Sequence, residues 1–247
     1  MTLPKDGLLL TLEGIDGTGK STQATLLAKA MGAVYGEDRV CLTRNPGGTP
    51  LGSEIREVLL AQRAPADAPT PLAELLLYMA DRAQHVQQVI LPALAQGHVV
   101  ICDRFIDSTL AYQGGGRQLS LNTISQLNQL ACQGVMPHLT LLLDADPMAL
   151  LQRREARGHK DRLEAESLAF QQAVRQQFLM LAHEHPQRID VIDASTSPQQ
   201  VHERLLASLT PFLGQAIPPV ATQPSAPAAK LVGGQAPMAK VASHATP

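Results

Sequence analysis

The sequence lacks a long apolar run, because no hydrophobic stretch approaches the roughly 18 residues that cross a bilayer as a helix. Its first residues, Met-Thr-Leu-Pro-Lys-Asp-Gly, do not contain the apolar segment of a signal peptide. We therefore expect no membrane-spanning segment, no membrane partner and a cytoplasmic location.

Cysteine is scarce, and the charge is close to balanced. Cys41, Cys102 and Cys132 lie far apart, without a CxxC pair or the cysteine–histidine spacing of a zinc site. Cys41 and Cys102 fall in apolar runs, which predicts buried free thiols. A net charge of −2 leaves no broad basic field for a nucleic acid polymer. A mononucleotide partner needs only local positive charge, which the sequence does supply.

Short apolar runs alternate with longer helical patterns along the chain. The strands are expected at 8–13, 39–43, 98–102, 139–144 and 188–193, and the helices at 20–32, 50–62, 71–95, 120–134, 146–157, 164–184 and 198–210. The strands lack polar alternation, as buried parallel strands do. This order predicts an α/β fold with a parallel sheet covered on both faces, and ligands at the carboxyl ends of its strands.

The composition changes at Gly214. Residues 214–247 contain nine Ala and six Pro but no Asp or Glu, and they show no hydrophobic periodicity. We expect one domain over 1–213 followed by a disordered tail over 214–247. A linker or docking role for the tail is the alternative.

Residues 14–22 read Gly-Ile-Asp-Gly-Thr-Gly-Lys-Ser-Thr and follow the first expected strand. A glycine-rich turn between a strand and a helix is typical of a phosphate-binding loop, in which backbone N–H groups surround phosphate oxygens. Lys20 is placed to reach the β- and γ-phosphates, and the Ser21 hydroxyl to ligate Mg²⁺. The loop predicts binding of a nucleoside triphosphate; an ordinary glycine turn is the alternative.

The apolar run at 98–102 ends in Asp103 and Arg104. An aspartate at the end of a strand beside a phosphate loop is placed to hold the hydration shell of Mg²⁺. Arg104 is placed to bind a second phosphate. A surface ion pair is the alternative interpretation.

Three further segments indicate a function only when they are considered together with the predicted phosphate-binding loop. The loop 43–50, Thr-Arg-Asn-Pro-Gly-Gly-Thr-Pro, is rich in turn residues. Tyr78 and Arg82 lie four residues apart on one helix face, where a ring and a guanidinium can bind a base; a core tyrosine and a surface arginine are the ordinary alternative. Residues 153–164 form a basic cluster around a glycine, which is either a solvated face or a lid over the triphosphate.

Taken in order, these motifs resemble bacterial thymidylate kinases over residues 7–212. The most specific segments are GIDGTGKST, TRNPGGTP, the stretch 102–117 and RGHKDRLE at 157–164. The resemblance implies a P-loop kinase with a three-layer fold, a five-stranded parallel sheet flanked by helices, and a short lid at about 153–164. It also implies a homodimer that uses ATP and Mg²⁺ to convert dTMP to dTDP for dTTP synthesis.

The resemblance also implies roles for individual residues. ATP would be bound by Gly14, Ile15, Asp16, Gly17, Thr18, Gly19, Lys20, Ser21 and Thr22, with Arg153 and Arg162 of the lid. The metal would be linked to Ser21 and Asp103. The dTMP site would consist of Asp16, Arg56, Tyr78, Arg82, Arg104, Thr109, Tyr112 and Gln113. Tyr78 would stack on thymine, Arg82 would bind the edge of the base, and Tyr112 would disfavour a ribose 2′-hydroxyl.

The catalytic residues implied are Lys20, Arg104, Asp16 and a lid arginine. Position 17 is glycine, so the phosphate loop carries no arginine and the lid would supply one; Arg157, beside the hinge glycine, is favoured. Asn45 stands where the family usually has glutamate. This departure leaves two alternatives to an active dTMP kinase open: a weakly active relative or a P-loop switch. Another nucleotide or nucleoside kinase of the same fold is the third.

Overall fold

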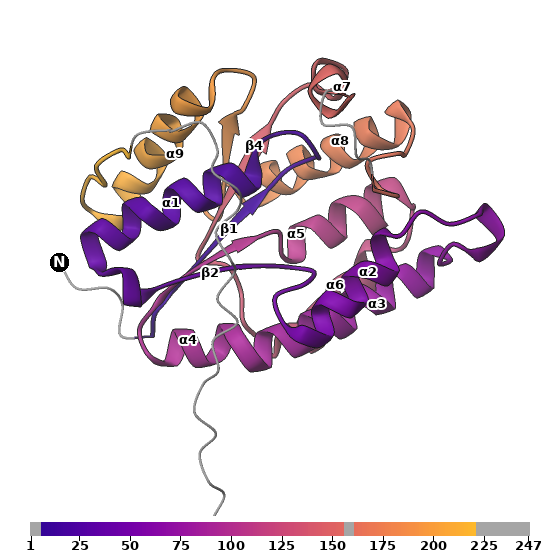
Figure 1. The fold of residues 1–247 in the computed structure, drawn as a ribbon, viewed down its shortest axis with the longest axis horizontal. Coiled ribbons are helices and arrows are strands. Elements are labelled where there is room, and N and C mark those ends of the chain that lie inside the picture. Colours follow the sequence, from indigo (N-terminus) through magenta and orange to yellow (C-terminus); the bar gives the residue numbers. More distant parts are fainter. Residues whose placement is uncertain (1–5, 156–160, 221–247) are drawn as a thin grey trace, which may run out of the picture.

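The computed structural model describes residues 6–155 and 161–220. Five parallel strands, β1 (Leu8–Glu13), β2 (Val40–Arg44), β3 (Val99–Asp103), β4 (Leu139–Asp144) and β5 (Ile189–Asp193), form one sheet in the order β2-β3-β1-β4-β5. Leu8 pairs with Val99 on one side of β1, and Leu10 pairs with Leu139 on the other. The predicted sheet is confirmed, and β1 lies at its centre with helices on both faces (Figure 1).

The central strand is buried on both faces, which explains its unbroken apolar sequence. Leu8, Leu10 and Leu12 face a cluster that includes Ala24 and Leu27 of helix α1. Leu9 faces the opposite side, where a second cluster contains Val86, Ile90, Val100, Phe105 and Cys132. Burying apolar side chains on both sides of a strand gives a continuous hydrophobic run instead of polar alternation.

The long helices begin at residues that suit helix starts. They are α1 (Lys20–Tyr35), α2 (Pro50–Leu60), α3 (Pro71–His85), α6 (Leu121–Cys132), α7 (Pro147–Glu155), α8 (Leu168–Glu184) and α9 (Pro198–Leu213). Thr49, Thr70 and Ser197 each accept a backbone hydrogen bond at an N-cap followed by proline. Helices α1 and α9 lie side by side in Figure 1.

Two helical segments differ from the prediction. The helix expected over 71–95 is interrupted after α3 by a π-helical turn, η3 (Val86–Ile90), and continues as α4 (Leu91–Ala95). Pro92 explains the interruption, because proline donates no backbone hydrogen bond and displaces the preceding turn. Residues after β3 form α5 (Ile106–Thr109) and the π-helical η4 (Leu110–Gly116), where no helix was expected. Two short 3₁₀ turns, Glu37–Arg39 and Pro65–Asp67, complete the described elements.

The packed chain continues past the boundary predicted at residue 213. Ile217 is only 4% exposed and belongs to the main hydrophobic cluster, and the Gln215 amide donates to the Tyr35 hydroxyl over 2.7 Å. Apolar burial against α1 and α9 therefore extends the domain to at least Ile217, and the rest of the predicted tail, 221–247, lies outside the described residues. Cys102 is a buried free thiol as expected, whereas Cys41, for which burial was also expected, is only half-buried. The thiol of Cys132 is free and buried as well. Among the described helices, none has the length and hydropathy of a membrane span.

Candidate nucleotide-binding site

The phosphate loop joins β1 to α1 in a conformation that depends on its glycines. Gly14, Gly17 and Gly19 all have positive φ, and a Cβ on Gly14 would lie 2.3 Å from the Leu143 carbonyl oxygen. Helix α1 begins at Lys20, and its N-cap, Gly19, has no side chain to bond the first N–H groups. These N–H groups and the positive end of the helix dipole form an anion-binding site.

Lys20 is buried in this loop, and its Nζ donates to the Ile15 carbonyl over 2.8 Å. Burial and the neighbouring Arg104 charge lower the pKa of Lys20 to about 8, against the opposing attraction of Asp16 and Asp103. A triphosphate would replace the carbonyl with a stronger, negatively charged acceptor. The lysine is therefore held next to the position expected for phosphate oxygens.

The Ser21 hydroxyl donates to Oδ2 of Asp103 over 2.5 Å, so the start of α1 meets the end of β3. Both parallel strands β1 and β3 end at this edge of the sheet. Mg²⁺ at phosphate sites takes one or two protein oxygens and completes its shell with water and phosphate. The Ser21–Asp103 pair fits that requirement. Among the described residues, no cluster of three or more His, Cys, Asp or Glu side chains forms a separate metal site.

Arg104 connects the phosphate loop to the next cavity. Its guanidinium donates to the Gly14 carbonyl over 2.9 Å, to Asp16 Oδ1 over 2.5 Å and to the Tyr112 hydroxyl over 3.2 Å. Burial alone would raise the pKa of Asp16, but Arg104 and Lys20 hold that pKa well below its usual range. Arg104 has a φ of 69°, a conformation rare for a residue with a side chain, and it persists because these contacts fix it.

Glu13 holds the segment that follows Arg104. Its carboxylate accepts from the Phe105 backbone N–H over 2.7 Å and from the Ser108 hydroxyl over 2.5 Å. Burial and the nearby Asp107 charge raise the pKa of Glu13 to about 7. Glu13 therefore positions the start of α5, from which Ser108 and Thr109 project toward the cavity.

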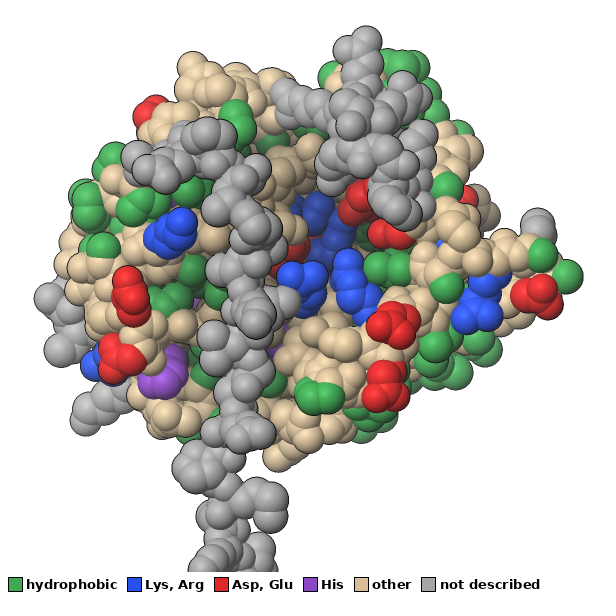
Figure 2. All heavy atoms as spheres, viewed as in Figure 1, with side chains coloured by type: hydrophobic (Ala, Val, Ile, Leu, Met, Phe, Trp, Pro, Cys, Tyr) green, Lys and Arg blue, Asp and Glu red, His purple; other side chains and the backbone are tan. Residues whose placement is uncertain are grey.

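A cavity that opens to solvent adjoins Arg104, and its space, open solvent included, is about 480 Å³. Its walls come from the phosphate loop, the 43–50 loop, α2, α3, the α5–η4 segment and the residues after position 160; they are Asp16, Asn45, Pro46, Arg56, Leu60, Tyr78, Arg82, Arg104, Ser108, Thr109, Tyr112, Gln113, Asp161 and Leu163. Figure 2 shows Lys and Arg side chains gathered in the hollow of this face. The structure thus brings together all eight residues expected at a dTMP site.

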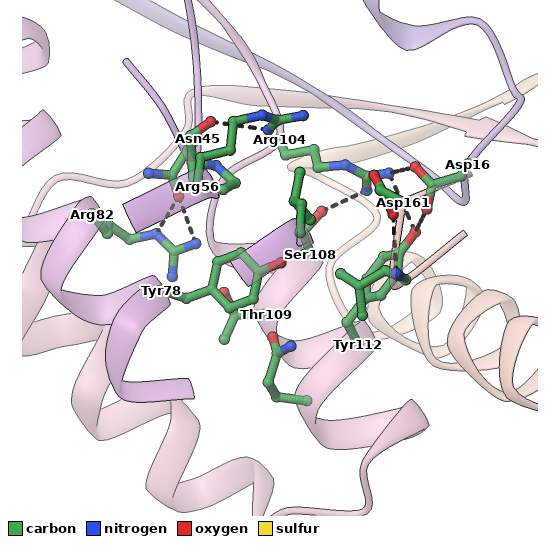
Figure 3. A pocket seen from close by; sticks show the side chains of 14 residues that line it. Asp16, Asn45, Arg56, Tyr78, Arg82, Arg104, Ser108, Thr109, Tyr112 and Asp161 are labelled. Carbon is green, nitrogen blue, oxygen red and sulfur yellow. Dashed lines mark hydrogen bonds and ion pairs between the residues drawn. The ribbon is translucent and has the colours of Figure 1, made fainter. Parts of the chain in front are cut away.

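Two polar groups leave the cavity ready for a ligand. The Thr109 hydroxyl is buried and, among the described residues, has no hydrogen-bond partner. An unsatisfied buried hydroxyl is costly, and a bound base or sugar would remove that cost. Arg56 also faces the cavity, with one N–H bonded to the Pro46 carbonyl over 3.1 Å. Tyr78 and Thr109 both line the cavity (Figure 3), so a ligand bound there can contact both.

Arg82 is buried, and the 43–50 loop holds it. Asn45 Oδ1 accepts from Nε of Arg82 over 3.1 Å and from Nη2 over 2.8 Å (Figure 3). Asn128 accepts from Nη1 of Arg82 over 2.5 Å. The Asn45 amide donates in turn to Asp81. Burial raises the pKa of Asp81 to about 6, although the Gly47 N–H and the Arg82 charge oppose this. Asn45 thus keeps the guanidinium in place without a carboxylate of its own.

The residues expected in the lid lie partly outside the described chain. Arg157 lies outside it, as does the side chain of Arg153. Arg162 is described, and it bonds to Glu74 and to the Leu59 carbonyl over 2.9 Å, not to the phosphate loop. Asp161 and Leu163 beside it line the cavity, so this end of the expected lid belongs to the cavity wall.

Several residues of this site were not identified from the sequence: Glu13, Glu74, Asp81, Ser108 and Asp161. Glu74 lies four residues before Tyr78 on the same helix face, and Ser108 and Asp161 fall inside motifs that attracted attention for other residues. The helical spacing of Glu74, Tyr78 and Arg82 was the available signal. Glu13 had no local signal, since it extends an apolar strand.

Comparisons with known proteins agree with this geometry. A family model described as thymidylate kinase matches residues 12–205. A thymidylate kinase of Synechococcus sp. is 53% identical over 207 residues, covering 83% of this chain and 96% of that protein. One from Deinococcus radiodurans is 48% identical over 205 residues, covering 83% and 97%.

A solved structure shares the fold as well. The crystal structure of thymidylate kinase from Ehrlichia chaffeensis superimposes with a TM-score of 0.68 at 37% sequence identity. The match covers 82% of this chain and 98% of that one, so nearly the whole length of the neighbour is represented here.

Proposed function

This chain belongs to the thymidylate kinase family, and we propose that its phosphate loop and the adjoining cavity hold ATP and dTMP during phosphoryl transfer. The reaction passes the γ-phosphoryl group of ATP to dTMP and gives ADP and dTDP, a step of dTTP synthesis. One observation carries the proposal: Arg104 lines the cavity while its guanidinium bonds to the Gly14 carbonyl of the phosphate loop. The two substrate sites therefore share a wall.

On the donor side, the N–H groups of residues 14–22 surround the phosphates of ATP, and Lys20 reaches the β- and γ-phosphates. Ser21 and Asp103 are the residues that would hold Mg²⁺. When bound, the ion neutralises charge on the β- and γ-phosphate oxygens. Arg153 of the lid side would complete the triphosphate site. Arg162 is held by Glu74, so we assign it to the support of the cavity wall that Asp161 and Leu163 form.

On the acceptor side, the ring of Tyr78 stacks on thymine, and Arg82 and Gln113 face the edge of the base. Thr109 supplies its free hydroxyl to the base or sugar. Arg104 and Arg56 bind the dTMP phosphate. The Tyr112 hydroxyl donates to Asp16 over 2.8 Å, and this pair occupies the space beside the sugar, which disfavours a 2′-hydroxyl.

Transfer is direct and in line. An oxygen of the dTMP phosphate attacks the γ-phosphorus, the bond to the β,γ-bridging oxygen breaks, and ADP leaves. The attacking oxygen is already anionic near neutral pH, so the site needs no strong general base. Positioning by Arg104 and charge stabilisation by Lys20 and a lid arginine account for the catalysis. We assign the lid role to Arg157.

Rapid-quench measurement of one turnover tests the lid assignment. Arg157→Ala lowers the rate of transfer at least 100-fold and leaves the KM for dTMP within about threefold, because the arginine acts on charge that develops in the transition state. Arg63→Ala, at an exposed position away from the cavity, is the matched control. A rate within tenfold of the parent would show that Arg157 is not the catalytic arginine.

The hydrogen bonds of Asn45 help to decide whether the chain is a weakly active relative, an alternative raised because Asn45 stands where the family usually has glutamate. Its carbonyl oxygen accepts from both Nε and Nη2 of Arg82, so the missing carboxylate does not leave that side of the guanidinium unpaired. We therefore infer that Asn45 supports turnover. Asn45→Glu tests this inference: a rise of more than tenfold in kcat would favour a weakened relative, and a change within threefold supports an active enzyme.

We also propose that the protein is a cytoplasmic homodimer. Leu72 and Leu76 lie on one face of α3 with 55% and 50% of their surface exposed, and Leu130 of the neighbouring α6 is 76% exposed. Exposed apolar side chains on adjacent helices favour a protein interface. Light scattering after gel filtration should give twice the chain mass, and Leu76→Glu should shift it to the monomer.

A further inference from the structure

Glu74 lies behind the cavity and has four polar contacts there. Its Oε1 accepts from Nε2 of Gln113 over 2.7 Å and from Nε of Arg117 over 3.3 Å. Its Oε2 accepts from Arg117 over 3.3 Å and from Arg162. Glu74 itself is fully buried, and it does not line the cavity.

The charges around Glu74 keep it ionised. Burial alone would raise its pKa, but hydrogen bonds from Arg117, Gln113 and Arg162 lower the pKa below its ordinary value. Arg117 also pairs with Glu166 over 2.6 Å, so two arginines face two carboxylates in this cluster. An ionised carboxylate accepts hydrogen bonds and donates none.

This property determines the direction of the Gln113 amide. The amide atom next to Glu74 must be the NH₂ group, because a carbonyl oxygen there would face a negative acceptor. The carbonyl oxygen Oε1 and one remaining N–H are then left for the cavity that Gln113 lines. Gln113 is itself buried, so water does not compete for this arrangement as it would at the surface.

We propose that Glu74 is a positioning residue for base selection: it fixes Gln113 with its carbonyl oxygen toward the base, so the pocket accepts a pyrimidine that carries a ring N–H. Thymine and uracil donate from N3, whereas cytosine has an acceptor at N3. Two acceptors facing each other leave a buried polar pair unsatisfied, which favours thymine over cytosine. The inference rests on the proposed position of dTMP in the cavity.

The same carboxylate also stabilises the part of the cavity wall next to Arg162. Arg162 bonds to Glu74 by its guanidinium and to the Leu60 carbonyl by its backbone N–H over 3.2 Å. Its neighbours Asp161 and Leu163 line the cavity. Glu74 therefore connects Gln113, which faces the base, with the wall formed by residues 161–163. Removal of the Glu74 carboxylate should loosen both.

Steady-state kinetics with dTMP and dCMP test the proposal. The quantity measured is the ratio of kcat/KM for the two acceptors on one preparation, which does not depend on the fraction of folded enzyme. Glu74→Gln should lower this ratio at least tenfold, because a neutral amide no longer dictates the direction of Gln113. Glu74→Asp keeps the charge and should retain the ratio within threefold. Glu166→Gln, which changes only the far partner of Arg117, is the matched control.

A swap variant gives an independent readout. In Glu74→Gln/Gln113→Glu the new amide donates to the new carboxylate, which still presents an acceptor to the base, and the cluster keeps its net charge. Its ratio should return toward that of the parent even if Glu74→Gln does not fold. An unchanged ratio in Glu74→Gln, or a swap that uses dCMP as well as dTMP, would overturn the role of Glu74. A parent that fails to distinguish the two acceptors would instead overturn the proposed position of dTMP.

Discussion

The Ser21 hydroxyl lies 2.5 Å from Oδ2 of Asp103 and thereby joins the first turn of α1 to the end of β3. These two oxygens come from separate elements that meet only because β1 and β3 are parallel neighbours. The fold thus places a hydroxyl and a carboxylate together beside the phosphate loop. Metal dependence is the property that this relationship predicts most directly.

Asp103→Asn should raise the Mg²⁺ concentration that gives half-maximal activity at least tenfold, because the amide no longer supplies a negative oxygen. The KM for dTMP should stay within about threefold. A magnesium titration of the initial rate measures both. If the half-maximal concentration is the same in Asp103→Asn and the parent, Asp103 has no part in holding the ion.

Lys20 and Arg104 carry different parts of the proposed mechanism, and kinetics can separate them. Lys20→Ala should abolish transfer and weaken ATP binding, whereas Arg104→Ala should abolish transfer and weaken dTMP binding. Calorimetric titration of each variant with each nucleotide provides the binding constants. Turnover within tenfold of the parent in either variant would contradict its role in charge stabilisation.

Asn45 is expected to affect the binding of dTMP and not the binding of ATP. Asn45→Ala removes the oxygen that accepts from Nε and Nη2 of Arg82, so the KM for dTMP should rise at least tenfold while the KM for ATP changes little. Ser53→Ala is the control, since Ser53 lies at the start of α2 and its hydroxyl donates to the Gly47 carbonyl over 3.5 Å. Equal KM values for dTMP in Asn45→Ala and Ser53→Ala would contradict the account of Arg82.

The raised pKa of Glu13 predicts that the free energy of unfolding depends on pH. Its pKa rises from 4.5 to about 7 on folding, so the protonated form stabilises the native state at low pH and this contribution is lost as the pH rises through about 7. Glu13→Gln should therefore reduce the fall in unfolding free energy between pH 5 and pH 8 by about 2 kcal/mol. Urea unfolding at both pH values measures the effect.

The matched control for this comparison is Glu57→Gln, at an exposed position on α2. It should leave the pH dependence of unfolding as it is in the parent. A Glu13→Gln variant with the same pH dependence as Glu57→Gln would show that Glu13 titrates alike in the folded and unfolded chains.

The strands of the sheet were predictable because each strand is marked by consecutive residues of the sequence. Each buried parallel strand is an apolar run, and all five were placed within about a residue of their observed bounds. The η4 segment was not predictable in the same way, since Gly114, Gly115 and Gly116 disfavour a helix locally. They are tolerated because α8 packs against them: a Cβ on Gly116 would lie 2.5 Å from the Phe170 ring.

In the site, too, residues in contiguous motifs were predictable, whereas residues that act through distant partners were not. Lys20, Ser21 and Arg104 belong to contiguous motifs, and the structure brings them together as expected. Glu74 and Asp81 act through partners 39 and 36 residues away in the sequence, Gln113 and Asn45, so only the folded chain reveals their contacts. Buried carboxylates of this kind resemble ordinary helix-surface residues until their partners are known.

A coupled assay of ADP release with ATP and Mg²⁺ tests the central claim most directly. The acceptors to compare are dTMP, dUMP, dCMP, dGMP and none. The account predicts fast release with dTMP, slower release with dCMP and dGMP, and little release without an acceptor. A folded protein that binds ATP but releases ADP at the same rate with and without dTMP would contradict it.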